Sequence, residues 1–365
     1  MNDGFQGSSV FVTKPFLPPL EEYQELVEGI WSSNQLTNGG ATTQKFEKQL
    51  CNYLEVSNFH FVANGTIALQ LALSGLGIND GEVITTPFSY VATTSVILWQ
   101  KCEPVYADID PHTLCINPDK IESLITKKTK AIMPVHVFGN ACDLNAIEDL
   151  ANHYNLKVIY DAAHAFAVTC QGKSLLEFGD VSTLSFHATK LFHTAEGGGI
   201  VSKSRDVHDL IELQKRFGHN GDTHHVLGIN AKPSELHAAL GLTNLKYAND
   251  ILEQRRQLYS KYDELLADDL YWYRQRLTIE KYNHAYYPII FDTEEITLLI
   301  LNKLSELSIF PRRYFFPSLN ELPYLKDRQQ CPNSESISRR IICLPLYVGL
   351  SEDTIQLISE VIHNV

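Results

Sequence analysis

The chain has 365 residues, a mass of 41.2 kDa and 44% hydrophobic residues, which predicts one large domain with a packed core and a smaller second domain. A net charge of -13 without any lysine or arginine run argues against nucleic acid as a partner, and no stretch approaches the roughly 20 apolar residues of a membrane span. Seven cysteines stand singly, without zinc or redox spacing, so we expect reduced thiols and a cytoplasmic protein.

Short apolar runs alternate with longer amphipathic runs between about residues 60 and 202. Strands are predicted over residues 59–62, 82–85, 104–107, 131–135, 158–160, 181–184 and 199–201. Helices are predicted between them over residues 67–75, 121–125 and 144–154. This alternation is typical of an α/β fold with a mostly parallel sheet between helices.

The remainder of the chain is mainly helical in pattern. Helices are predicted over residues 206–216, 233–266, 296–307 and 351–362, and a strand over residues 286–291. We place a domain boundary near residue 250, which divides the chain into a large domain of residues 1–250 and a small α+β domain of residues 251–365.

A titratable side chain follows each of two predicted strands. Asp161 follows the strand at 158–160, and Lys190 follows an apolar run that begins at Val181. In isolation, Asp161 fits a helix N-cap and Lys190 an ordinary surface lysine, but ligands gather at the carboxyl ends of such strands. A lysine that forms a Schiff base and an acid that keeps a pyridine nitrogen protonated are how some enzymes hold pyridoxal phosphate. The pair therefore predicts a pyridoxal-phosphate site.

Further residues near strand ends fit the same cofactor. The turn at residues 64–66 opens a helix, so the amides of Gly65 and Thr66 suit a phosphate, although a simple helix cap has the same pattern. Ser185 adds a hydroxyl for the phosphate. Tyr90 follows another strand end, where its ring either covers a planar cofactor or packs in the core.

Two other site types are disfavoured. The fourteen histidines lack Cys, Asp or Glu partners at a recognised ligand spacing, so no metal is expected. The glycine cluster at residues 196–199 lacks the GxGxxG spacing and precedes a strand, which argues against a nicotinamide dehydrogenase.

Taken together, the motifs resemble the sugar-nucleotide aminotransferases of fold type I, the pyridoxal-phosphate enzymes built like aspartate aminotransferase. The resemblance spans nearly the whole chain, through residues 33–40, 64–66, 86–93, 135–139, 161–165, 185–190, 196–198, 228–232 and 311–314. It departs at Tyr160, where many relatives carry an acid.

The resemblance implies roles in cofactor binding for Gly65, Thr66, Tyr90, Asp161, His164, Ser185, Lys190 and Asn230. Lys190 would form the internal aldimine and Asp161 would bind the pyridine nitrogen. Gly65, Thr66 and Ser185 would hold the phosphate, Tyr90 would stack on the ring, and His164 would lie near the ring hydroxyl. Asn230 would reach the cofactor phosphate of a neighbouring subunit, which implies a homodimer with shared active sites.

Substrate contacts are implied for Arg312 and Tyr314, which match a region that touches the nucleotide diphosphate, and for His187 beside the lysine. Residues 186–190 are most like those of enzymes that transfer the amino group of L-glutamate to the 4-keto carbon of a dTDP-4-keto-6-deoxyhexose, giving a gluco product for O-antigen or another surface polysaccharide.

Three alternatives stay open. One is amination at C3, because the sequence fixes neither the position nor the stereochemistry, nor the nucleotide base. Another is a pyridoxal-phosphate sugar dehydratase, against which Lys190 argues, since the known 3-dehydratase has histidine there. The third is a regulator that binds the cofactor without turnover.

Overall fold

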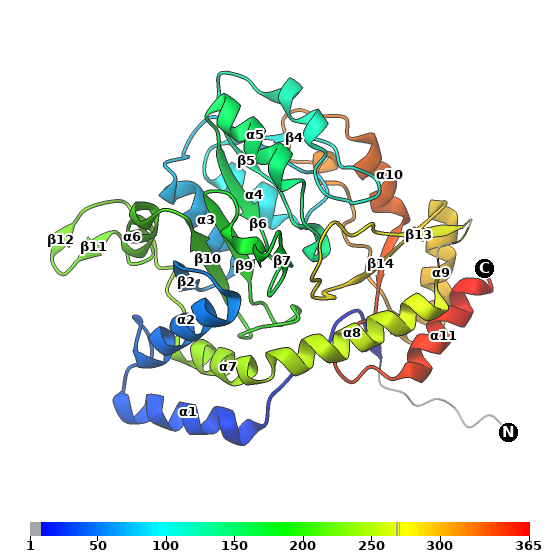
Figure 1. Ribbon diagram of the computed structural model, residues 1–365, viewed down its shortest axis with the longest axis horizontal. Helices are drawn as coiled ribbons and strands as arrows, with labels where there is room; N and C mark the ends of the chain where they lie inside the picture. The colour runs from blue at the N-terminus through cyan, green and yellow to red at the C-terminus, as the bar shows by residue number, and fades with distance from the viewer. Residues whose placement is uncertain (1–8, 268, 270) are drawn as a thin grey trace.

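The computed structural model describes residues 9–267, 269 and 271–365, and a seven-stranded sheet lies at its centre (Figure 1). In spatial order the strands are β2 (Phe59–Val62), β10 (Gly198–Ser202), β9 (Val181–Ser185), β6 (Lys157–Asp161), β5 (Thr129–Met133), β3 (Glu82–Thr85) and β4 (Glu103–Tyr106). All neighbours from β9 to β4 pair in parallel, whereas β10 is antiparallel to both β9 and β2. The predicted mostly parallel α/β sheet is confirmed.

Successive strand residues pack on opposite faces of this sheet. Val83 and Ile159 belong to the hydrophobic cluster of one face, and Ile84 and Tyr160 to that of the other. The first face is covered by α3 (Gly65–Gly75), α4 (Ala92–Trp99) and α6 (Arg205–Gln214). The second face packs against α2 (Ala41–Leu54), α5 (Leu144–Tyr154) and α7 (Glu235–Lys246). The apolar runs in the sequence are long because both faces are buried.

Two predicted helices differ from the structure. Within residues 121–125 only the 3-10 turn η2 (Glu122–Leu124) forms, just after η1 (Pro118–Lys120), because five residues are too few to nucleate an α-helix. The helix predicted over residues 233–266 is two helices, α7 and α8 (Ala248–Leu265), which meet at Tyr247 with φ −102° and ψ 2°. The Tyr247 hydroxyl bonds Glu22 of α1 (Leu20–Ser33), a contact that helical periodicity does not reveal.

A smaller antiparallel sheet forms the C-terminal part of the fold. It contains β13 (Trp272–Arg274), β14 (Tyr287–Phe291) and β16 (Ile341–Leu344), and α8, α9 (Glu294–Glu306) and α11 (Glu352–His363) share its hydrophobic cluster. β1 (Val10–Phe11) pairs in parallel with β15 (Ile309–Phe310), so the start of the described chain lies beside this unit (Figure 1). The boundary near residue 250 falls in the first turn of α8, and the division into two domains stays a prediction.

Shorter elements complete the fold: α10 (Pro332–Arg340), the hairpins β7 (Thr169–Cys170) with β8 (Lys173–Ser174) and β11 (His219–Asn220) with β12 (Thr223–His224), and the turns η3 (Val137–Gly139), η4 (Leu175–Glu177) and η5 (Leu319–Glu321). Over the described ranges, none of the helices combines the length and the apolar character that a bilayer crossing requires.

Candidate active site

A cavity of about 760 Å³ lies at the carboxyl ends of the central strands. It gathers nine of the residues expected at the site: Gly65, Thr66, Tyr90, Asp161, Ser185, His187, Lys190, Arg312 and Tyr314. They converge because β6 and β9 are parallel neighbours, with Asp161 opposite Thr183, and so end at the same edge of the sheet. The C-terminal unit closes the cavity with Arg312 and Tyr314, whose guanidinium and ring centres lie 5.9 Å apart.

Lys190 follows β9 by five residues, in a turn where its amide donates to the His187 carbonyl at 2.9 Å. Burial lowers the pKa of its amine to about 8, and the negative charge of Asp161 opposes part of this shift. A lowered pKa leaves more of the amine neutral near neutral pH, which suits attack on an aldehyde.

Asp161 is the last residue of β6 and is only 5% exposed. Thr93 Oγ1 donates to Asp161 Oδ2 at 2.8 Å, and the Ala163 amide donates to Oδ1 at 3.2 Å. Burial raises the pKa of this carboxyl, while the two hydrogen bonds and the charge of Lys190 act in the opposite direction. A buried acid facing a cavity is suited to pair with the protonated nitrogen of a pyridine ring.

The N-terminus of α3 forms a cradle for an anion. Asn64 caps the helix, its Oδ1 accepting from the Ile67 amide at 2.9 Å, which leaves the amides of Gly65 and Thr66 without intrahelical acceptors. Gly65 packs so closely on β9 that a Cβ atom there would lie 2.9 Å from Ser185 Cβ. Amine, buried acid and cradle together fit the aldehyde, ring nitrogen and phosphate of pyridoxal 5'-phosphate.

His164 is not among the residues that line this cavity. Its Nδ1 accepts from the Phe138 amide at 3.2 Å, and its ring is parallel to those of Phe138 and Phe315 within 7°. Burial, and then the charge of Lys190, lower the pKa of His164 well below its ordinary value, so the ring is neutral. Its expected place near the ring hydroxyl stays a prediction.

Asn230 is exposed and does not line the cavity of its own chain. It forms a backbone bridge with Arg216, and the next carbonyl, of Ala231, accepts from the Ala63 amide at 2.9 Å, just before the phosphate cradle. A role for Asn230 at the cavity of a second subunit stays a prediction.

His187 and Glu196 form a polar pair beside Lys190. The Thr189 amide donates to His187 Nδ1 at 3.2 Å, which leaves Nε2 as the donor nitrogen, 3.7 Å from Glu196 Oε1. Both side chains line the cavity, so a donor and an acceptor face the space beside the lysine.

Sequence reasoning missed several residues of this site: Thr93, Glu196, Tyr286 and Phe315. Thr93 and Glu196 lie inside motifs that the sequence did single out, at residues 86–93 and 196–198. Tyr286 and Phe315 come from the C-terminal unit, where no local signal ties them to the strand ends.

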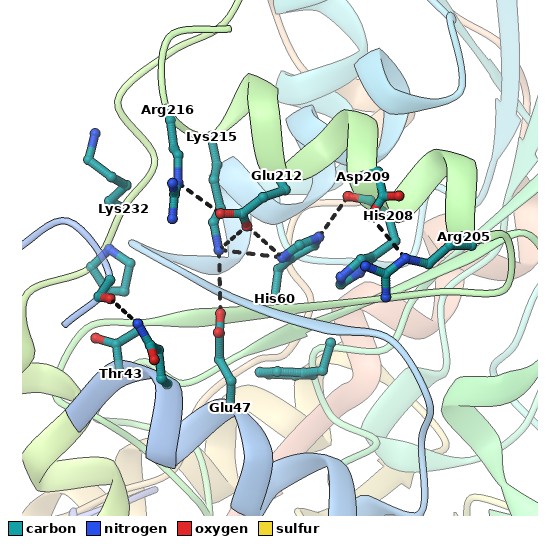
Figure 2. Close-up of a pocket in the computed structure, with 14 residues that line it drawn as sticks. Thr43, Glu47, His60, Arg205, His208, Asp209, Glu212, Lys215, Arg216 and Lys232 are labelled. Atoms are coloured by element: carbon teal, nitrogen blue, oxygen red, sulfur yellow. Dashed lines mark hydrogen bonds and ion pairs between the residues drawn. The ribbon is translucent and has the colours of Figure 1, made fainter. Parts of the chain in front are cut away.

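A second, smaller cavity of about 230 Å³ lies between α2, β2 and α6 (Figure 2). Lys215 Nζ lies 2.7 Å from Glu212 and 3.4 Å from Glu47, and His60 Nδ1 lies 3.2 Å from Glu212 (Figure 2). Arg216 also pairs with Glu212, at 2.8 Å. The charges of Lys215 and Arg216 are thus balanced by Glu47 and Glu212, and removal of the buried Lys215 from this network is expected to be destabilising. Within the described ranges, no three His, Cys, Asp or Glu residues are grouped to hold a metal ion.

Comparison with known proteins points to one family. Residues 20–363 match the model of the DegT/DnrJ/EryC1/StrS aminotransferase family. Two similar proteins are named dTDP-4-amino-4,6-dideoxy-D-glucose transaminase: one from Shigella dysenteriae, 42% identical over 98% of this chain and 99% of its own, and one from Escherichia coli, 36% identical over 99% of both.

Among solved structures, DesI, crystallised in the presence of its TDP-sugar product, superposes with a TM-score of 0.92 at 29% identity, over 98% of this chain and 93% of its own. The match covers both the large sheet and the C-terminal unit. On the family model and the relatives together, this chain belongs to the DegT/DnrJ/EryC1/StrS aminotransferase family.

Proposed function

We propose that this chain is a pyridoxal-phosphate-dependent transaminase that moves the amino group of L-glutamate onto the 4-keto carbon of a dTDP-4-keto-6-deoxyhexose. The product is a dTDP-4-amino-4,6-dideoxyhexose of gluco configuration. The observation that carries the proposal is the single cavity that holds Lys190, Asp161 and the amides of Gly65 and Thr66. The two transaminases that share its length, and the TDP-sugar enzyme that shares its fold, support the substrate class.

When bound, pyridoxal 5'-phosphate supplies an electron sink for a carbanion at the donor α-carbon. Lys190 holds the cofactor through its amine until glutamate displaces it. The freed amine would carry the proton between the donor α-carbon and the cofactor carbon, and a water molecule would supply the carbonyl oxygen of the 2-oxoglutarate that leaves. With the keto sugar, Lys190 moves the proton in the reverse direction, so one side chain serves both half-reactions.

Other side chains orient this chemistry. Asp161 keeps the ring nitrogen protonated, which makes the sink effective. Gly65, Thr66 and Ser185 anchor the phosphate, and the exposed ring of Tyr90 covers the cofactor plane. On the substrate side, Arg312, Tyr314 and His187 contact the sugar nucleotide, with the guanidinium suited to a diphosphate.

We further propose that the active unit is a homodimer, that it works in the cytoplasm, and that its product enters O-antigen or another surface polysaccharide. The exposed position of Asn230, outside its own cavity, supports sharing of sites between subunits. The seven cysteines are all free thiols, which supports a reducing compartment.

Incubation with L-glutamate and a panel of keto sugar nucleotides tests the reaction. The panel varies the base and places the ketone at C3 or C4, and NMR reads the position and configuration of the new amine. We expect a C4 amine from the dTDP-4-keto sugar and equimolar 2-oxoglutarate, and no product from Lys190→Ala. A C3 amine would support the alternative transaminase, and loss of water without amine transfer would support a dehydratase. A bound chromophore that glutamate leaves unchanged would indicate a regulator.

A further inference from the structure

The loop between β3 and α4 and the first turn of α4 each contribute a buried hydroxyl, Ser89 and Thr93, to which the proposed reaction assigns no role. Tyr90 of this loop is 63% exposed at the cavity, whereas Ser89 and Thr93 are 3% and 0% exposed. Thr93 is the second residue of α4, 68 positions before Asp161 in the sequence. Its place beside the carboxylate therefore depends on the tertiary fold.

The direction of the hydrogen bonds is fixed by the number of protons. An ionised carboxylate only accepts hydrogen bonds, so the Thr93 hydroxyl donates its single proton to Asp161 Oδ2, at 2.8 Å. The Ser89 hydroxyl lies 2.7 Å from Thr93 Oγ1, and it must donate because Thr93 has no second proton. The result is a one-way chain of hydroxyls that ends on the carboxylate, in which each bond polarises the next.

These hydrogen bonds fix the orientation of the Asp161 carboxylate from the protein side. Oδ2 accepts from Thr93 and Oδ1 accepts from the Ala163 amide, so both oxygens have a donor behind the cavity wall. The free lone pairs of Asp161 are then directed to the cavity, where Lys190 lies. Hydrogen bonds to the charged form also favour ionisation, against the effect of burial.

We propose that Thr93, supported by Ser89, is a positioning residue that holds Asp161 ionised and aimed at the ring nitrogen of the cofactor. The inference rests on the proposed function for the identity of that ring. Without the Thr93 hydroxyl, the buried Asp161 carboxylate loses one of its two donors, so it binds the protonated ring nitrogen less strongly.

The test uses the holoenzyme loaded with cofactor labelled with ¹⁵N at the ring. Thr93→Val removes the hydroxyl at nearly constant volume, and Thr93→Ser keeps it. The matched control is Thr94→Val, because Thr94 is the next residue of α4, is equally buried, and bonds Tyr106 at 2.8 Å instead of Asp161. The readouts are the ¹⁵N signal of the bound ring, kcat and the KM for glutamate.

We expect Thr93→Val to move the ¹⁵N signal toward that of the unprotonated ring and to lower kcat about 10- to 100-fold with little change in KM, as for loss of a hydrogen bond to a charge. Ser89→Ala should produce a smaller change, about 5-fold in kcat. Thr93→Ser and Thr94→Val should retain the protonated signal.

A wild-type nitrogen signal in Thr93→Val, or an equal loss in Thr94→Val, would overturn the inference. If Thr93→Val does not fold, the other two variants decide. A kcat near wild type for Thr93→Ser together with a lower kcat for Ser89→Ala supports the inference. Equal kcat values for these two variants overturn it. The nitrogen signal needs no amino acceptor. A wild-type enzyme that aminates no sugar would therefore refute the proposed function and leave this test in force.

Discussion

The lowered pKa of Lys190 has a measurable kinetic consequence in the protein freed of its cofactor. Burial brings this pKa from the ordinary 10.5 to about 8. At pH 7 about 9% of the amine is then neutral, against about 0.03% for an unperturbed lysine, a difference of roughly 300-fold in nucleophile. The rate of covalent cofactor attachment should therefore rise about tenfold between pH 6 and pH 7 and level off above pH 8.

The assay mixes apoprotein with excess pyridoxal 5'-phosphate and follows the visible absorbance of the attached cofactor in a stopped-flow instrument. N-acetyl-lysine methylamide in the same buffers corrects for the titration of the cofactor itself. Asp161→Asn is the informative variant: because the charge of Asp161 raises the pKa of Lys190, its removal should move the plateau to lower pH. A rate that climbs steadily to pH 10 in the native protein would refute the burial of this amine.

Three further predictions follow from packing and charge. Gly65→Ala should weaken cofactor affinity about 10-fold in equilibrium titration, because the new methyl contacts β9 at the phosphate cradle. The control Gly29→Ala, whose methyl would have nothing within 4 Å, should leave the affinity unchanged. Equal affinities in the two variants would contradict the cradle. Lys215→Met should lower the free energy of unfolding in urea by about 3 kcal/mol, since Glu47 loses its cation and Glu212 keeps only Arg216 and His60, and a loss below about 1 kcal/mol would contradict a stabilising network. Mixed dimers of Lys190→Ala and Asn230→Ala subunits should regain up to half of the activity at one native site, and no recovery would contradict shared sites.

The ion-pair network around Lys215 should make the protein less stable at acidic pH. Burial alone would raise the pKa of Glu212, but the hydrogen bond from His60 and the charge of Lys215 lower it to about 2. Its folded pKa is thus below its unfolded value of about 4.5, so its contribution is complete above pH 4.5 and is lost as pH falls toward 2.

The sequence predicted the central sheet well because its strands are buried on both faces and read as unbroken apolar runs. It also located Asp161 and Lys190, since Asp161 ends one such run, Lys190 follows another by five residues, and parallel strands end at one edge. Helix α5 was predicted with its observed bounds, because Asp143 caps it and its apolar residues recur at helical spacing.

The rest depends on contacts between distant residues. Thr93 bonds Asp161 across 68 positions, and no local pattern distinguishes it from the neighbouring Thr94, which faces Tyr106. At the helix break, Tyr247 bonds Glu22, 225 positions away, while the residues on both sides keep helical periodicity. Phe315, whose ring lies parallel to that of His164, likewise comes from the distant C-terminal unit.

Identification of the lysine that binds the cofactor covalently tests the proposed function most directly. Reduction of the loaded protein with borohydride, followed by proteolysis and mass spectrometry, should place a phosphopyridoxyl group on the peptide that contains Lys190. Treatment with L-glutamate before reduction should remove that label, because the amino acid displaces the lysine. A label on another lysine, or none at all in a protein that binds the cofactor, would contradict the assignment of Lys190.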